Sequence, residues 1–292
     1  MKVLLAVDKS LHAALAVQTL KQCYTATEVE ILHVLDLEAI PHPHLSAALI
    51  DWYHKKIRSL LEAEANQFLP KFQAVLVPVF QNVCVSVREG RTADVILKTA
   101  ASSGASLIVI GSRGLSTIQS LLLGGVTYRV VHEATCPVLV VRREMTAIRK
   151  ILLAVDRSQG AEHAVRFLAE QSLFHPCPVV AVTVCPSPPF AELLPESVRR
   201  YGLAAASEYL REVGDRLSAR GYAVELRVVE DDPAVAILGQ ANAEGIDLVV
   251  IGSRGLHGLR RLLLGSVSRK VLAYTTKSVL IVPGGSTQAG LG

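Results

Sequence analysis

Glycines placed to bind phosphate occur in two similar stretches of the sequence. Residues 111–125 read GSRGLSTIQSLLLGG and residues 252–266 read GSRGLHGLRRLLLGS. In each stretch the first glycine ends a short apolar run, where the lack of a side chain lets the backbone turn and approach a ligand. The last glycine comes just before an apolar helical segment, whose first amide groups and dipole favour an anion. The pattern predicts a phosphate site in each copy, although the glycines could also be simple turn residues and helix caps.

One hydroxyl group and two arginines distinguish the copies. The shared glycines are Gly111, Gly114 and Gly124 in the first copy and Gly252, Gly255 and Gly265 in the second. The second copy continues with Ser266, whose hydroxyl can donate to a phosphate oxygen, whereas the first continues with Gly125. Thr127 is expected to compensate in part. Because Arg260 and Arg261 lie only in the second stretch, we expect the added positive charge there, and with it the tighter site.

Two further pairs of charged residues recur with the glycines. Asp8 and Asp156 follow the first apolar run of each copy, where a carboxylate could reach a ribose hydroxyl or a metal bound to phosphate. Arg113 and Arg254 come two residues after the first glycine. Each arginine could close over a phosphate through charge-assisted hydrogen bonds or remain a solvated loop residue.

The whole chain is an internal duplication. Residues 2–10 read KVLLAVDKS and residues 150–158 read KILLAVDRS. A chain of 292 residues is long enough for two domains, each with its own core. We expect a first domain over residues 1–143, a linker over 144–149, a second domain over 150–283 and a disordered Gly-rich tail over 284–292.

Apolar runs and helical stretches alternate along each copy. In the first copy, strands are predicted at Val3–Val7, Val29–Leu35, Leu107–Ile110 and Val138–Val141, with a less regular strand within Ala74–Val87. Helices are predicted at Leu11–Gln22, Leu45–Leu69, Ala93–Ser103 and Leu121–Glu133. This rhythm indicates an α/β fold with a parallel sheet covered on both faces. Ligands of such sheets bind beyond the carboxyl ends of the strands, where the glycine motifs lie.

Composition excludes several classes of protein. Hydrophobic residues make up 50% of the chain and charged residues 19%, which suits buried parallel strands, and the apolar runs are too short to cross a bilayer. The five cysteines form no CxxC pair, which is typical of reduced thiols. The net charge of +4 comes from interspersed charges rather than a basic tract. We therefore expect a soluble cytoplasmic protein that binds neither nucleic acid nor membrane.

Motifs for other chemistry are weak. The sequence has no GK[ST] loop and no GxGxxG fingerprint after a strand, so a P-loop NTPase or a dehydrogenase is not supported. His42, His44, Asp51 and His54 offer ligand atoms for a metal, but their spacing fits no common site, and a polar loop that opens a helix is the preferred interpretation. Ser10 and Ser158 follow the two aspartates and are predicted to cap helices. No catalytic residue and no metal ligand is assigned.

The sequence resembles a tandem member of the universal stress protein family. Nucleotide-binding members of that family carry a Gly, two residues, a Gly, nine residues, a Gly and then Ser or Thr, and the second copy matches this pattern fully. The resemblance implies two tandem doubly wound parallel five-stranded sheets, Rossmann-like and similar to adenine nucleotide alpha hydrolases. It also implies ATP as the cofactor, with or without Mg²⁺, with adenine in an apolar slot and phosphates on the glycine loop.

The resemblance also implies the residues that contact the nucleotide. The second copy supplies Ala154, Asp156, Val184, Gly252, Arg254, Gly255, Gly265, Ser266, Val267 and Ser268. The first copy supplies the weaker or lost site of Ala6, Asp8, Val34, Gly111, Arg113, Gly114, Gly124, Gly125, Val126 and Thr127.

Three functions remain open on the sequence alone. The first is an ATP-binding stress-response or regulatory protein without efficient turnover. The second is an enzyme that hydrolyses ATP or transfers phosphoryl or nucleotidyl groups, and it would need a base that the sequence does not reveal. The third is a ligand-free scaffold. We also expect an intrachain pseudo-dimer in which strands Val138–Val141 and Val279–Val282 cover each other, with a homodimer and an unidentified protein partner as further options.

Overall fold

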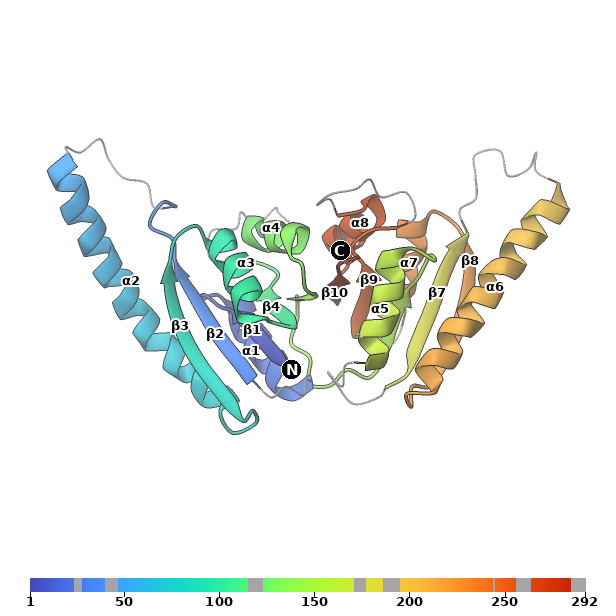
Figure 1. Ribbon diagram of the computed structural model, residues 1–292, viewed down its shortest axis with the longest axis horizontal. Coiled ribbons are helices and arrows are strands. Elements are labelled where there is room, and N and C mark those ends of the chain that lie inside the picture. Colours follow the sequence, from blue (N-terminus) through green and yellow to red (C-terminus); the bar gives the residue numbers. More distant parts are fainter. Residues whose placement is uncertain are drawn as a thin grey trace, which may run out of the picture. The chain divides into compact units, whose positions relative to one another are not determined.

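The chain forms two compact units, Met1–Thr146 and Ala147–Gly292. The computed structural model describes residues 1–23, 28–39, 47–114, 123–170, 177–185, 195–243, 245–255 and 264–284. Within each unit, strands and helices alternate as the sequence predicts (Figure 1).

The first unit is a five-stranded parallel sheet in the order β3-β2-β1-β4-β5. Its strands are β1 (Lys2–Ala6), β2 (Glu28–Leu35), β3 (Asn82–Glu89), β4 (Leu107–Gly111) and β5 (Val138–Val141). Its helices are α1 (Leu11–Cys23), α2 (Ala47–Leu76), α3 (Thr92–Ser103) and α4 (Gly125–Glu133). Helix α1 packs against α2, and α3 packs against α4, as expected when right-handed crossovers place one pair on each face of the sheet.

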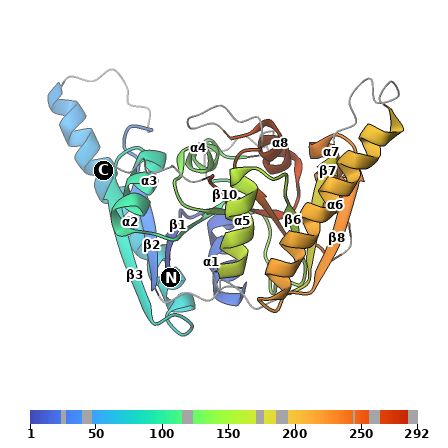
Figure 2. The same cartoon turned by 45° about the vertical axis from the view of Figure 1, so that its right-hand side comes forward.

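The second unit repeats this topology with the order β8-β7-β6-β9-β10. Its strands are β6 (Ile151–Ala154), β7 (Val179–Cys185), β8 (Val224–Glu230), β9 (Leu248–Gly252) and β10 (Ser278–Val282). Its helices are α5 (Gln159–Glu170), α6 (Glu196–Ser218), α7 (Pro233–Ala241) and α8 (Ser266–Tyr274). Helix α6 runs along β7 and β8 (Figure 2). Each unit is thus a doubly wound α/β sheet, and the fold expected from the sequence is confirmed.

The central strands form the core of each unit. Leu4, Leu107 and Leu139 of the first unit are completely buried, as are Ile151 and Leu152 of the second. Such strands are apolar on both faces because helices cover both faces. The strand order reverses direction between β1 and β4 and between β6 and β9, so a crevice opens at the carboxyl ends of these strands.

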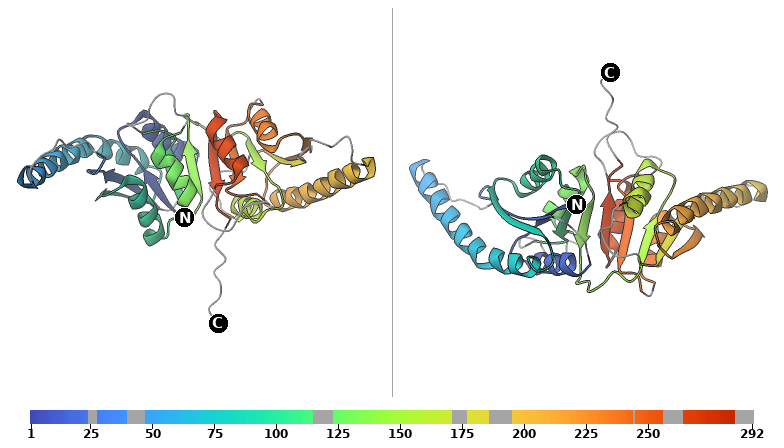
Figure 3. Two further views of the ribbon diagram at one scale, coloured as in Figure 1. Left: turned by 90° about the horizontal axis from the view of Figure 1, so that it is seen from above. Right: turned by 60° about the horizontal axis from the view of Figure 1, so that its bottom comes forward.

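Two element boundaries differ from the expectation. The predicted strand within Ala74–Val87 begins only at Asn82, because residues up to Leu76 belong to α2, which reaches 30 residues and continues past the strands (Figure 3). Helix α4 begins at Gly125 rather than at Leu121, because Gly124 is an extended N-cap residue. Leu45 and Leu121 lie outside the described residues.

A backbone-to-backbone contact fixes the start of α5. A Cβ atom added to Gly160 would lie 2.6 Å from the carbonyl oxygen of Arg254, and one added to Gly252 would lie 2.5 Å from the Gly160 backbone. Both positions therefore exclude any side chain. Gly239 in α7 has nothing within 4 Å of the same added atom.

We predict opposite effects for two glycine-to-alanine changes in helices. Gly160→Ala should lower the free energy of unfolding by about 1–3 kcal/mol, because the new methyl group overpacks the contact with Arg254. Gly239→Ala should raise it by about 0.5–1 kcal/mol, since alanine is the better helix former. Urea denaturation followed by circular dichroism measures both. Equal stabilisation by the two changes would mean that α5 does not approach the glycine loop this closely.

Candidate functional site

A cavity of about 650 Å³ lies at the carboxyl ends of β6, β7 and β9 in the second unit. This volume is typical of small-molecule sites. The cavity collects residues that lie up to 114 positions apart in the sequence. All ten site residues predicted for the second copy line it: Ala154, Asp156, Val184, Gly252, Arg254, Gly255, Gly265, Ser266, Val267 and Ser268.

The turn after β6 forms one wall of this cavity. Asp156 accepts a hydrogen bond from the amide of Ser158 at 3.1 Å, and the hydroxyl of Ser158 accepts one from the amide of Ala161 at 3.1 Å. The predicted capping role of Ser158 is therefore confirmed. The same hydroxyl lies 3.0 Å from the carbonyl oxygen of Arg254 and donates to it, which joins the turn to the glycine loop.

The glycine loop and the start of α8 form the second wall. The amide of Gly265, the N-cap residue of α8, donates to the carbonyl of Ser253 at 2.7 Å. Its N-cap residue makes no side-chain cap hydrogen bond among the described residues, so its first amide groups and its positive dipole end face the loop. Ser266 is exposed at the first helical position, where its hydroxyl can reach a ligand. Ser268 is buried, and its hydroxyl donates to the carbonyl of Gly252 at 2.7 Å.

The third wall is apolar and belongs to β7 and α6. Val182 and Tyr209 are almost fully buried, and Val184 is half-buried at the end of its strand. Thr183 contributes no free donor, because its hydroxyl is bonded to the carbonyl of Val155 at 2.9 Å. Gly202 faces the cavity without a side chain. The result is a slot suited to a flat apolar ring.

Two contacts at the rim were missed by reasoning from the sequence. Arg199 of α6 forms a bidentate ion pair with Glu230 at the end of β8, at 2.7 and 3.0 Å. Arg157 lies over the ring of Tyr209, 5.1 Å from its centroid, and it is a non-glycine residue with a positive φ of 60°. Arg199 and Tyr209 lie on a helix about 50 residues after Arg157, and no local spacing links them. Arg58 and Glu89 form the equivalent ion pair in the first unit. The recurrence of an Arg and a Glu at this spacing was the one signal in the sequence that pointed to the Arg199–Glu230 pair.

The first unit repeats the frame of this site. Ser10 caps α1 by accepting from the amide of Ala13 at 3.2 Å and donates to the carbonyl of Arg113 at 3.4 Å. A Cβ atom on Gly114 would lie 2.8 Å from the Asp8 carboxylate, as one on Gly255 would lie 2.6 Å from that of Asp156. Of the other predicted residues, Ala6 ends β1, Val34 lies in β2, Gly111 ends β4, Gly124 is the N-cap of α4, and Gly125, Val126 and Thr127 open that helix.

One expectation for the first unit is wrong. Thr127 does not replace the missing hydroxyl, because it is 3% exposed and donates to the carbonyl of Gly111 at 2.8 Å, as Ser268 does to Gly252. The expectation that Arg260 and Arg261 add positive charge only at the second loop is not tested, but Arg142 adds an arginine beside the first loop. His12 and Arg142 interact electrostatically with Arg113, and burial followed by Arg113 lowers the pKa of His12. Arg260 and Arg261 lie outside the described residues.

Metal and membrane sites find no support in the described part of the chain. Among the residues that the structure describes, no group of three His, Cys, Asp or Glu side chains could hold a metal ion. His42 and His44 lie outside these residues, whereas Asp51 and His54 lie on α2. None of the described helices is long and apolar enough to cross a membrane.

Comparison with known proteins gives a consistent family. A family model described as "Universal stress protein family" matches residues 1–142 and again residues 147–283. A universal stress protein of Mycolicibacterium smegmatis is 30% identical over 190 residues, which cover 62% of this chain and 63% of that protein. One of Thermus aquaticus is 35% identical over 144 residues, which cover 48% of this chain and 97% of that protein.

A solved structure extends the likeness to both units. The crystal structure of a universal stress protein from Archaeoglobus fulgidus matches with a TM-score of 0.70 at 21% identity, covering 98% of this chain and 97% of that one. At this identity the likeness shows the shared fold.

Cys185 offers a chemical test of the cavity rim. Burial, and then the negative charge of Glu230, raise the pKa of its thiol. We predict that Glu230→Gln speeds alkylation of Cys185 by iodoacetamide at pH 8, because a lower pKa gives more reactive thiolate. Cys84, whose pKa is raised by burial and then by Glu30, is the control and should react at an unchanged rate. Peptide-level mass spectrometry measures both rates. An unchanged rate at Cys185 would mean that Glu230 does not raise the pKa of its thiol.

Proposed function

The chain belongs to the universal stress protein family, and from that premise we propose that its second unit binds ATP as a regulatory ligand. The first unit binds ATP weakly or not at all. One observation carries this proposal: the ten residues matched to the family's nucleotide site line a single cavity of about 650 Å³.

The chemistry of the cavity suits each part of a nucleotide. The slot between β7 and α6 offers Val184 and Tyr209 to an adenine ring. Asp156 lies between the slot and the glycine loop, where its carboxylate accepts from a ribose hydroxyl or holds Mg²⁺ at the phosphates. The uncapped start of α8 with Ser266, together with Arg254, presents donors and positive charge to the phosphates.

Binding without efficient turnover is the form of this function that the lining favours. The carboxylates among the described lining residues are Asp156 and Glu230. Glu230 is paired with the guanidinium of Arg199, and Asp156 is the group assigned here to the ribose or to Mg²⁺. The described lining contains no histidine. Efficient hydrolysis needs a base poised to activate water, so the lining supports a bound regulatory ligand better than an enzyme.

The role in stress regulation follows from the family. A ligand that binds only the folded second unit stabilises that unit by mass action, and a protein partner can respond to that state. Covering of β5 by β10 within one chain remains a prediction of the sequence.

We predict that the hydroxyl at position 266 sets the difference between the two sites. Ser266→Gly should weaken the tightest ATP site roughly ten- to a hundredfold, because a hydrogen bond to a charged group contributes about 1.5–3 kcal/mol. Gly125→Ser should strengthen any ATP site in the first unit, and a Cβ at that position meets nothing within 4 Å. Isothermal titration calorimetry measures both affinities.

Matched valine substitutions identify the unit that holds ATP. Gly255→Val should abolish the tight site, since its side chain would displace the Asp156 carboxylate, and Gly114→Val should leave the tight site intact. The reverse result would assign the tight site to the first unit, and the absence of ATP binding in the unmodified chain would refute the proposal.

A further inference from the structure

Three basic residues gather at the glycine loop of the first unit. Arg113 lies in the loop itself. His12 packs directly on the start of the loop, where a Cβ on Gly111 would lie 2.8 Å from its backbone and side chain. Arg142 follows β5, and the amide of Ser112 donates to the carbonyl of the preceding residue, Val141, at 2.8 Å. Backbone hydrogen bonds therefore hold Arg142 beside the loop.

The two arginines repel one another, and their positive charges disfavour the protonated form of His12. Burial first, and then Arg113, lower the pKa of His12 against the opposing effect of Asp8, and Arg142 lowers it further. Burial and Arg113 also lower the pKa of Arg142 to about 10. The Nε atom of Arg113 is buried and finds no hydrogen-bond partner among the residues that the structure describes. Such a cluster is stabilised when an anion enters it.

The start of α4 adds donors at the same place. The amide of Gly124 bonds to the carbonyl of Ser112 at 2.9 Å, which fixes the helix start against the loop. In the described part of the first unit no side chain caps the helix at Gly124, and Gly125 and Val126 are exposed at its first positions. The first amide groups and the helix dipole therefore complement the arginines.

The second unit lacks both added basic groups. The repeat places Gly160 where the first unit has His12 and Pro283 where it has Arg142. Gly160 cannot carry a side chain there because of its contact with Arg254. The basic cluster is thus a feature of the first unit rather than of the duplicated frame.

Larger side chains stand in the first unit at positions where the second unit has small residues that line its cavity. The strand registers align His33 with Thr183, and the imidazole of His33 packs edge-on against Phe68 with 5.1 Å between ring centroids. The ion pairs Arg58–Glu89 and Arg199–Glu230 are equivalent in the two units, so they fix how α2 aligns with α6. In this alignment Leu61 of α2 takes the place of Gly202 of α6, which lines the cavity.

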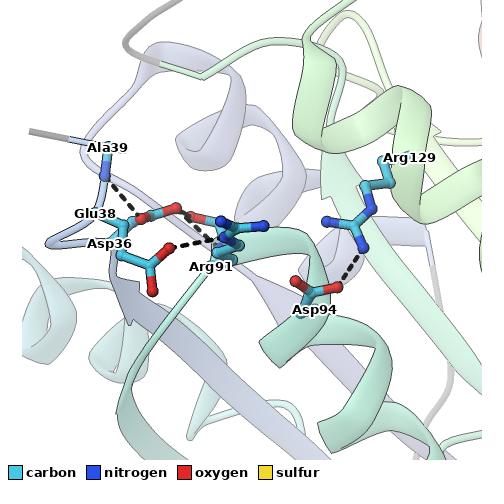
Figure 4. A network of polar contacts seen from close by, with 7 residues as sticks. Asp36, Glu38, Ala39, Arg91, Asp94 and Arg129 are labelled. Atoms are coloured by element: carbon cyan, nitrogen blue, oxygen red, sulfur yellow. Dashed lines mark hydrogen bonds and ion pairs between the residues drawn. The ribbon is translucent and has the colours of Figure 1, made fainter.

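A polar network closes the same region from β2. Asp36 accepts from both the amide and the hydroxyl of Thr92 at 3.0 Å and so holds the start of α3. Arg91 donates to Glu38 at 2.7 Å beside it (Figure 4). Pro233 aligns with Thr92 and lines the cavity of the second unit. A proline has no hydroxyl or amide hydrogen, so it cannot make the two hydrogen bonds that Thr92 makes. These contacts tie polar side chains at the end of β2 to the start of α3, in the region that aligns with the second-unit cavity.

We propose that the first unit is a site for a compact phosphate anion without a nucleoside, held by Arg113, Arg142 and His12 at the start of α4. Inorganic phosphate and pyrophosphate are the chemical class that fits, because their charge meets the cluster and they need no apolar slot. The site does not require that the second unit bind ATP, so the chain can hold two different phosphate ligands.

Titration of the full chain with inorganic pyrophosphate tests this site. Calorimetry in saturating ATP should still detect about one pyrophosphate per chain. Arg142→Gln should weaken pyrophosphate binding about tenfold or more, as expected when a charge-assisted contact is lost. Lys71→Gln removes one exposed positive charge from α2 and should have no effect. Unchanged urea denaturation of Arg142→Gln, followed by circular dichroism, shows that its first unit is folded, and unchanged ATP affinity shows that its second unit is intact.

Two results would overturn the proposal. One is equal pyrophosphate affinity in the unmodified chain, Arg142→Gln and Lys71→Gln. The other is loss of pyrophosphate binding when ATP is saturating, which means that both ligands share one site. If Arg142→Gln also loses ATP, His12→Gln decides in the same way. Without any ATP binding, the comparison of variants still decides this proposal, while the proposed function alone fails.

Discussion

The structure depends on one close approach, in which the turn after the first strand of each unit docks on the glycine loop after the fourth strand. In the second unit the backbones of Gly160 and Gly252 meet with no room for a side chain between them. A serine hydroxyl then joins the turn to the loop, Ser158 to Arg254 in the second unit and Ser10 in the first. Because the strand order reverses here, this contact also positions the carboxylate, the helix start and the apolar wall around one crevice.

Duplication kept this frame and changed what surrounds it. In the second unit, small residues such as Gly202 leave space beside β7, and the loop faces an open cavity. In the first unit, the imidazole of His33 is hydrogen-bonded to the carbonyl of Val7, and Asp36 is bonded to the start of α3. Arg142 adds positive charge beside the loop. We propose that the two units divide the parts of nucleotide recognition between them: one would keep room for the base, and the other would strengthen binding of phosphate.

Most of the fold could be predicted from the sequence because each element carries a local signal. Buried strands read as apolar runs, and Ser10 and Ser158 mark helix starts by their position after an aspartate. The sequence could not show that the hydroxyl of Thr127 donates to the carbonyl of Gly111, because that hydrogen bond joins residues 16 positions apart on two elements. The sequence likewise could not show that His12 lies near Arg142, because the two are 130 residues apart and only the sheet brings them together.

Hydrogen exchange of the full chain with and without ATP tests the division of roles most directly. The account predicts that ATP slows exchange in peptides covering β7, the loop at 252–255 and the start of α8. Peptides covering β2, the loop at 111–114 and the start of α4 should exchange at the same rate with and without ATP. Protection of the first-unit peptides that equals or exceeds that of the second unit would contradict the assignment of the nucleoside cavity to the second unit.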